Sequence, residues 1–473
     1  MARASTGSRA NEERETSKRI GALAALWPFV RPYRVMMGFA IVALVATATV
    51  SLVLPLAVRK VVDNFNADES NLLDQYFAMA IVVVALLAFG TGMRYALVTR
   101  LGERVVTDIR KAVFGRVINM SPAFYDNILT GEVLSRITTD TTLILSVIGS
   151  SVSIALRNML IFAGGLTMLL LTSVKLTGLL LLIVPIVALP VLTLGRRLRV
   201  LSRENQDFIA ASSGNASEVL SALQTVQAFT HETASRQTFD RVTEKSFELA
   251  AQRINTRVLM TMIVIYMIFS GVVGVLWIGV HDIRSNAISA GELAQFVIYA
   301  ILVAGSASAL SEIWGELQRA AGATERLVEL LQAQDTVTEP ENPLDLSQPL
   351  RGEIIFDDVH FRYPARPDRL SLSQINLTIN PGETVALVGP SGAGKTTIIQ
   401  LILRFYDPTS GQVRLDGVNL CDLRRDVFRN VVALVPQDPV VFAASALENI
   451  RFGNPEASDE QVYAAARAAV AHE

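Results

Sequence analysis

Six long apolar segments dominate the first two-thirds of the chain. Each is long enough, or nearly so, to cross a hydrocarbon layer of about 30 Å as a helix. Soluble proteins rarely need six buried helices of this length, so the pattern predicts a helical membrane domain. Pro55, Pro185 and Pro190 fall within or at the ends of these segments, where membrane helices tolerate proline. The predicted spans are residues 35–58, 76–97, 155–171, 176–194, 258–280 and 293–310.

The distribution of basic residues between the spans predicts their orientation. Arg and Lys are frequent before the first span, between the second and third, and between the fourth and fifth, whereas the other loops are acidic or carry one positive charge. The positive-inside rule then puts both termini and both long loops in the cytoplasm. We therefore expect a multi-pass protein of the cell (inner) membrane. The polar segment up to Lys18 contains Glu12, Glu13 and Glu15, which favours a cytoplasmic tail over a transit peptide.

The two long cytoplasmic loops combine charged and apolar residues at helical spacing, over residues 101–120 and 202–255. We expect the spans to continue as helices, since twenty extra residues extend a helix by about 30 Å. Each loop would then reverse through a short segment, 121–132 or 223–230, placed to contact a cytoplasmic domain. Plain helical hairpins without a partner remain an alternative.

A Gly-rich segment near the C-terminus follows the P-loop pattern. It lies between an apolar stretch, Thr384–Val388, expected to be a parallel-sheet strand, and a segment with helical spacing that begins at Thr397. Glycines let backbone N–H groups surround a phosphate, and a helix N-terminus favours the anion. Lys395 would reach the β- and γ-phosphates, and the Thr396 hydroxyl would bind Mg²⁺. The predicted nucleotide-binding residues here are Gly389, Pro390, Ser391, Gly392, Ala393, Gly394, Lys395, Thr396 and Thr397.

Composition narrows the class of protein further. The net charge is −2 and no basic tract with interleaved aromatics occurs, which argues against a nucleic-acid partner. Cys421 is the single cysteine, so an internal disulfide framework is excluded and a reducing compartment is favoured. The predicted fold is an all-α six-helix membrane domain followed by a partial α/β P-loop nucleotide-binding domain. Its predicted parts are a tail and interfacial segment (1–34), the six-span domain (35–320), a polar, Pro-containing linker (321–350) and the P-loop domain (351–473).

Membrane spans followed by a P-loop domain resemble the exporter branch of the ATP-binding cassette (ABC) transporters, in half-transporter form. Ser121–Tyr125 with Thr130–Arg136 is similar to the first coupling-helix region of that family, and Gln224–Phe229 with His231 and Glu232 to the second. Residues 312–327 resemble the end of its sixth helix in bacterial members. The resemblance implies a homodimer or heterodimer in the lipid bilayer that exports a small molecule, lipid or peptide with energy from ATP. The mostly apolar spans favour a lipophilic or amphiphilic cargo.

The resemblance also implies further site residues. Phe361–Pro364 resembles the A-loop, which implies that Tyr363 stacks on adenine, although a strand tyrosine packing on the sheet is the alternative. Val435–Asp438 follows an expected strand, Val431–Leu434, and resembles the Q-loop. Gln437 would then bind Mg²⁺ or its water, unless it is an ordinary exposed loop residue. The implied cofactors are ATP and Mg²⁺.

The sequence after Gln437 contains no Leu-Ser-Gly-Gly-Gln signature and no aliphatic strand ending in Asp-Glu. His472 has no such strand before it, so it is not a credible switch histidine. We expect a C-terminally truncated member of the family in which no catalytic residue is present, since the acidic pair would supply the general base. Two interpretations stay open: the N-terminal part of an exporter, or a non-catalytic ATP-binding partner subunit.

Two arginines, Arg94 and Arg157, lie at or near membrane depth. They could contact an anionic group of the substrate. Alternatively, each lies near the cytoplasmic interface and extends its guanidinium to the lipid headgroups. The sequence favours the second interpretation.

Overall fold

The computed structural model of the protein describes residues 20–63, 70–126 and 128–471. Residues 1–19 of the expected tail, residues 64–69 between the first two spans, residue 127 and the last two residues, His472 among them, lie outside these ranges. The chain divides into two compact units. The helical unit comprises the chain up to Val113 together with Ser135–Glu329, and the C-terminal unit comprises Phe114–Leu134 together with Leu330–Glu473.

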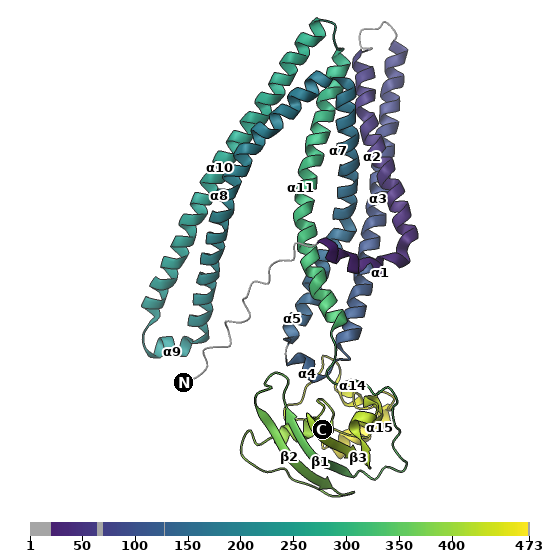
Figure 1. Cartoon of the computed structure of the whole chain (residues 1–473), viewed down its shortest axis with the longest axis vertical. Helices are drawn as coiled ribbons and strands as arrows, with labels where there is room; N and C mark the ends of the chain where they lie inside the picture. Colours follow the sequence, from purple (N-terminus) through teal and green to yellow (C-terminus); the bar gives the residue numbers. More distant parts are fainter. Residues whose placement is uncertain (1–19, 64–69, 127, 472–473) are drawn as a thin grey trace. The chain divides into compact units, whose positions relative to one another are not determined.

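Six long helices carry the six predicted spans, as Figure 1 shows. Each contains a stretch long and apolar enough to cross a membrane, which confirms the prediction of a six-helix membrane domain. Pro55 lies inside the first of them, and Pro185 and Pro190 inside the fourth. The helices are α2 (Arg34–Asp63), α3 (Ser70–Val117), α7 (Val152–Thr172), α8 (Val174–Ser221), α10 (Glu232–Arg284) and α11 (Ala290–Gln332), with the short α1 (Trp27–Val30) before them.

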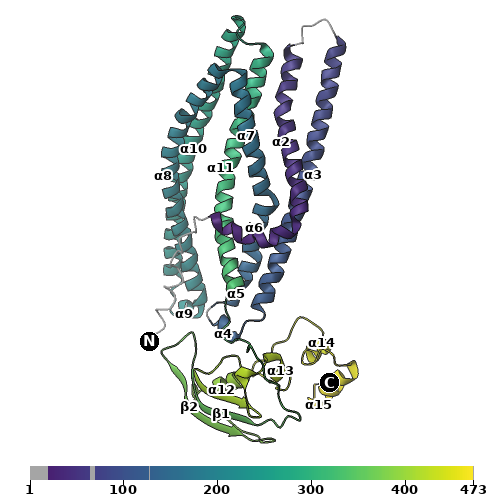
Figure 2. The same cartoon turned by 45° about the vertical axis from the view of Figure 1, so that its right-hand side comes forward.

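The predicted extension of the spans is also confirmed. Helix α3 continues to Val117, α8 continues to Ser221, and α10 begins at Glu232, each about twenty residues or more beyond its apolar stretch. The chain reverses through short helices at the expected places, namely α4 (Pro122–Tyr125), α5 (Thr130–Ser135) and α9 (Leu223–Ala228). Helices α8 and α10 lie side by side along their length, as Figures 1 and 2 both show.

Between α5 and α7 the chain stays helical through two π-helical turns, Arg136–Asp140 and Val147–Ser151, which flank α6 (Thr141–Ser146). Asp140 is buried there and accepts two hydrogen bonds from Arg326 of α11, at 2.8 and 2.6 Å. A buried carboxylate is stable only when it is paired in this way. The two-pronged contact therefore fixes this segment against α11.

The C-terminal unit is built on a four-stranded antiparallel sheet in the order β2-β1-β3-β4. Its core joins sheet residues such as Phe356 to Leu401 of α12 and Phe428 of α13. Two further helices, α14 and α15, follow. The elements are β1 (Ile354–Arg362), β2 (Leu370–Ile379), α12 (Lys395–Ile402), β3 (Ser410–Leu415), β4 (Val418–Asn419), α13 (Arg425–Arg429), α14 (Ala446–Arg451) and α15 (Asp459–Ala468).

Two strand predictions are wrong. Thr384–Val388 and Val431–Leu434 form no strand, and Val388 is 88% exposed. A parallel strand is held by hydrogen bonds to its neighbours, and among the described residues neither segment has a pairing partner. Apolar composition alone therefore does not make these segments strands. Residues 321–332, which the sequence assigned to the linker, are the last turns of α11.

Candidate functional site

The P-loop turns inward immediately before α12. Gly392 and Gly394 have φ values of +85° and +92°, a region that glycine adopts without strain. A Cβ atom at Gly394 would also lie 2.5 Å from Cδ2 of Leu372, so a side chain there would force Leu372 to move. The first N–H groups of a helix have no partner within the helix. The first backbone N–H groups of α12 are therefore available as donors for an anion.

A pocket of about 350 Å³ opens at this turn. Lys395, Arg366 and Arg369 make its lining positive, which suits a polyphosphate anion. The Lys395 ammonium donates to the carbonyl oxygens of Gly389 and Pro390, at 2.9 and 2.8 Å. The two arginines were not predicted as site residues, although both follow Tyr363 within six positions. The other lining residues are Tyr363, Leu370, Ser371, Ser391, Gly392, Gly394, Thr396 and Thr397.

Tyr363 lies one residue beyond β1 and lines the same pocket. Its hydroxyl donates to Oε1 of Gln400 at 2.6 Å and lies 2.9 Å from the Thr397 hydroxyl. Its ring packs edge-on against Phe361 and Tyr406, with centroids 4.9 and 5.2 Å apart. The side chain thus packs against the domain core and also forms one wall of the basic pocket.

Gln437 is exposed and does not line this pocket. It follows the segment that was wrongly predicted to be a strand. Among the described residues, no three His, Cys, Asp or Glu side chains gather as a metal site. Of the two predicted magnesium ligands, Thr396 lines this pocket and Gln437 does not.

The aromatic cluster continues from the pocket to the loop between the second and third spans. Tyr406 is buried, and its hydroxyl donates to Oδ2 of Asp126 at 2.7 Å. Burial, together with the Asp126 carboxylate, raises the pKa of the Tyr406 phenol well above its usual range. Ala123 of α4, 1% exposed, belongs to the same hydrophobic core as Phe356 and Leu401. The 114–134 segment is therefore part of the packed C-terminal unit, as predicted for a segment that contacts a cytoplasmic domain.

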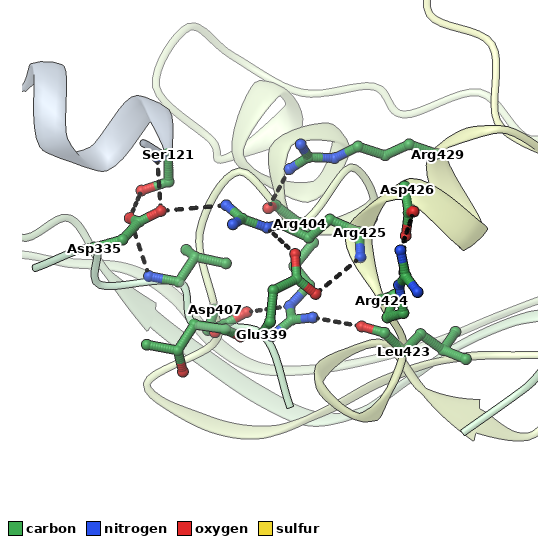
Figure 3. A network of polar contacts seen from close by, with 12 residues as sticks. Ser121, Asp335, Glu339, Arg404, Asp407, Leu423, Arg424, Arg425, Asp426 and Arg429 are labelled. Atoms are coloured by element: carbon green, nitrogen blue, oxygen red, sulfur yellow. Dashed lines mark hydrogen bonds and ion pairs between the residues drawn. The ribbon is translucent and has the colours of Figure 1, made fainter. Parts of the chain in front are cut away.

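A polar network holds the same segment from a second side, as Figure 3 shows. The Ser121 backbone N–H and hydroxyl both donate to the Asp335 carboxylate, at 2.9 and 2.5 Å. Arg425 of α13 pairs with Asp335 at 3.2 Å and with Glu339 at 2.6 Å. Arg404, 2% exposed, donates to Asp407 and to the Leu423 carbonyl oxygen nearby. Asp335 thus ties the segment after α11 to both α13 and the residue that precedes α4.

Comparison with known proteins agrees with this arrangement. Residues 37–306 match the ABC transporter transmembrane region, and residues 372–472 match the ABC transporter family. The chain is 35% identical over 459 residues to the mitochondrial potassium channel ATP-binding subunit of Pongo abelii, covering 94% of this chain and 63% of that protein. It is 31% identical to ABC transporter B family member 1 of Dictyostelium discoideum, covering 98% of this chain and 51% of that protein.

A bacterial relative is similar over more of its own length. The putative export ATP-binding/permease protein RC1073 of Rickettsia conorii is 27% identical over 444 residues, which cover 94% of this chain and 77% of that protein. The chain therefore spans about half to three-quarters of the relatives named here. The transmembrane match alone covers more than half of the chain and coincides with the six helices. The P-loop and its basic pocket fall within or beside the second match, where the family binds ATP. This chain belongs to the ABC transporter family, of the exporter type.

Proposed function

We propose that this chain is part of an ATP-driven exporter that works as one half of a dimer. Its cargo is a lipophilic or amphiphilic molecule that crosses the cell membrane, and both termini are cytoplasmic. One observation carries the proposal: the loop between the second and third spans is packed into the core of the unit that holds the P-loop. A membrane helix that ends inside the nucleotide-binding unit is suited to transmit its movements.

The residues of the pocket fit a nucleoside triphosphate with Mg²⁺. The P-loop amides with Lys395, Arg366 and Arg369 would hold the phosphates, since all are donors in one small basic pocket. The Tyr363 ring would lie against adenine, and the Thr396 hydroxyl, with Gln437, would bind Mg²⁺. When bound, ATP supplies the free energy of phosphoryl transfer to water.

Packed side chains connect the pocket to the membrane helices. Tyr363 lines the pocket, Tyr406 contacts Tyr363, and Asp126 accepts a hydrogen bond from Tyr406. A shift of Tyr363 would therefore reach the 114–134 segment through a single intermediate residue. Closure of two nucleotide-binding domains would then pull α3, which leads into this segment, and change the access of the bundle from one side to the other.

The relatives named as an ATP-binding subunit of a potassium channel favour a second candidate function. In this alternative the chain binds ATP and controls an ion pathway in a partner protein. This alternative agrees with the interpretation, left open by the sequence, that the chain is a non-catalytic ATP-binding partner subunit. The two functions differ in what crosses the membrane when ATP is supplied.

Full-length protein in liposomes distinguishes them. The exporter predicts ATP-dependent accumulation of a lipid, drug or peptide probe, lost in Lys395→Ala and kept in Lys245→Ala, which changes an exposed lysine of α10. ATP-sensitive potassium flux that requires an added partner protein, without accumulation of any probe, would support the channel subunit and refute the exporter.

A further inference from the structure

Two arginines of the membrane helices donate hydrogen bonds to neighbouring helices, which differs from the expectation that they extend to the headgroups. Arg94 of α3 is 8% exposed, and its Nη1 atom donates to the Ser153 hydroxyl at 2.8 Å. Arg157 of α7 is half-buried, and its Nη2 atom donates to the Ser51 hydroxyl of α2 at 3.3 Å. Both guanidinium groups therefore lie among α2, α3 and α7.

Neither guanidinium is neutralised by the described part of the chain. The Nε atoms of Arg94 and Arg157 are buried and have no hydrogen-bond partner there. No ion pair among the described residues includes either arginine. Ser153, which accepts from Arg94, lies four residues before Arg157 on α7, so the two positive charges lie near each other. The Glu316 carboxylate of α11 accepts instead from the Ser151 hydroxyl at 2.5 Å.

In the described part of the chain, the hydrogen-bond acceptors of the two arginines are the neutral hydroxyl groups of Ser153 and Ser51. Ser51 donates its own proton to the Thr47 carbonyl oxygen at 2.8 Å, so that its lone pairs face Arg157. An unpaired charge inside membrane helices is costly, and a second like charge adds repulsion. Two buried Nε–H donors that come from neighbouring positions have the charge and the free hydrogen-bonding capacity to hold one anion.

We propose that Arg94 and Arg157 form a binding site for the anionic headgroup, phosphate or carboxylate, of an amphiphile. Arg94 lies three residues before the predicted end of the second span, and Arg157 two residues after the start of the third. Both are therefore at the end of the apolar layer that the positive-inside rule assigns to the cytoplasmic leaflet. A headgroup bound here would leave its alkyl chain at the depth of the apolar spans. The amphiphile is either a resident lipid or the cargo, and the second reading rests on the proposed export function.

The site is tested by binding, without ATP. Full-length protein in phosphatidylcholine nanodiscs is titrated with dodecyl phosphate, and its thermal unfolding is followed. Dodecyltrimethylammonium, which has the same chain and the opposite charge, serves as the ligand control. We expect dodecyl phosphate to raise the Tm of the wild type and to bind about tenfold more weakly to Arg94→Gln or Arg157→Gln. Arg100→Gln, which changes an exposed arginine of α3, should bind like the wild type.

A purely structural role of the arginines gives a different result. If Arg94→Gln lowers the Tm in phosphatidylcholine but keeps wild-type affinity for dodecyl phosphate, the proposal is wrong. The same holds if Arg100→Gln weakens binding equally. Should a glutamine variant fail to fold, Arg94→Lys decides, because it keeps the charge and should retain more affinity than Arg157→Gln.

The origin of the headgroup is decided separately. If phosphatidylglycerol in the nanodisc prevents dodecyl phosphate binding and is itself not moved by ATP, the anion is a resident lipid. If dodecyl phosphate accumulates in liposomes when ATP is present, the site binds cargo. Because the titration needs no ATP, failure of the export function leaves the binding result standing, and absence of binding leaves export untouched.

Discussion

The contact between Ser121 and Asp335 should hold the 114–134 segment in the C-terminal unit. Asp335→Ala removes the carboxylate that joins Ser121, at the start of α4, to Arg425 of α13. The Asp335 side chain is 13% exposed, so water does not readily replace the lost contacts. We expect this substitution to loosen the 114–134 segment while the sheet of the unit stays folded.

The structure sets the size of the effect. A hydrogen bond to a charged group contributes about 1.5–3 kcal/mol, and Asp335 accepts two from Ser121. Arg425 keeps its contact with Glu339 at 2.6 Å, so its share of the loss is small. Asp335→Ala should therefore destabilise the docked segment by about 3 kcal/mol. Ser121→Ala removes the hydroxyl but keeps the backbone N–H donor, so its cost should be about 1.5 kcal/mol.

Hydrogen–deuterium exchange of the full-length protein measures this loss. Amides of residues 118–126 should exchange roughly a hundredfold faster in Asp335→Ala, since each 1.4 kcal/mol is about a factor of ten. Asp438→Ala, at an exposed aspartate of the same unit, is the control. The Ser121→Ala/Asp335→Ala double variant should exchange no faster than Asp335→Ala alone. Unchanged exchange in Asp335→Ala, or fully additive effects in the double variant, would show that the contact between Ser121 and Asp335 does not hold the segment.

Three further predictions concern the nucleotide-binding unit. Gly394→Ala should weaken ATP binding by roughly tenfold or more in an equilibrium titration, because it strains a backbone at positive φ and brings a Cβ atom against Leu372 of β2. Gly453→Ala, with open space around it, should bind ATP normally, and equal affinities of the two variants would contradict the loop geometry. Tyr406→Phe should lower the free energy of unfolding by only about 1 kcal/mol in chemical denaturation, since exposed Asp126 regains hydrogen bonds to water, yet it should lower ATP-dependent transport. Unchanged transport together with reduced stability would exclude Tyr406 from the coupling between the pocket and the membrane helices. Burial raises the pKa of the Cys421 thiol to about 11, so maleimide at pH 8 should modify this thiol about a hundredfold more slowly than an ordinary thiol. Above pH 8 the rate should rise about tenfold per pH unit until the pH reaches the pKa. Equal rates in folded and urea-unfolded protein would contradict this pKa.

The membrane domain was largely predictable from the sequence. Apolar length fixes where a helix can cross a bilayer, and residues 101–120 and 202–255 kept helical spacing beyond the spans, so α3, α8 and α10 continue as expected. The reversals at α4 and α9 were predictable for the same reason. The P-loop could be recognised because its glycines are required by the backbone itself, as the φ of Gly394 shows.

The remaining features depend on neighbours that no local pattern reveals. Thr384–Val388 has the composition of a strand but no pairing partner among the described residues. The burial of Arg94 depends on packing among α2, α3 and α7, which hydropathy does not report. The contact of Tyr406 with Asp126 joins residues far apart in the sequence. Contacts of this kind connect the basic pocket to the 114–134 segment, and they can be found only in the folded structure.

In the proposed function, ATP bound at this P-loop drives transport through the six helices. The most direct measurement is uptake of an amphiphilic probe into liposomes that contain the full-length protein, with Mg²⁺ and ATP outside, for the wild type and for Lys395→Ala. We expect ATP-dependent accumulation in the wild type and none in Lys395→Ala, with both proteins equally folded. Accumulation that persists in Lys395→Ala, or ATP binding by the wild type without movement of any lipid, drug or peptide probe, would contradict it.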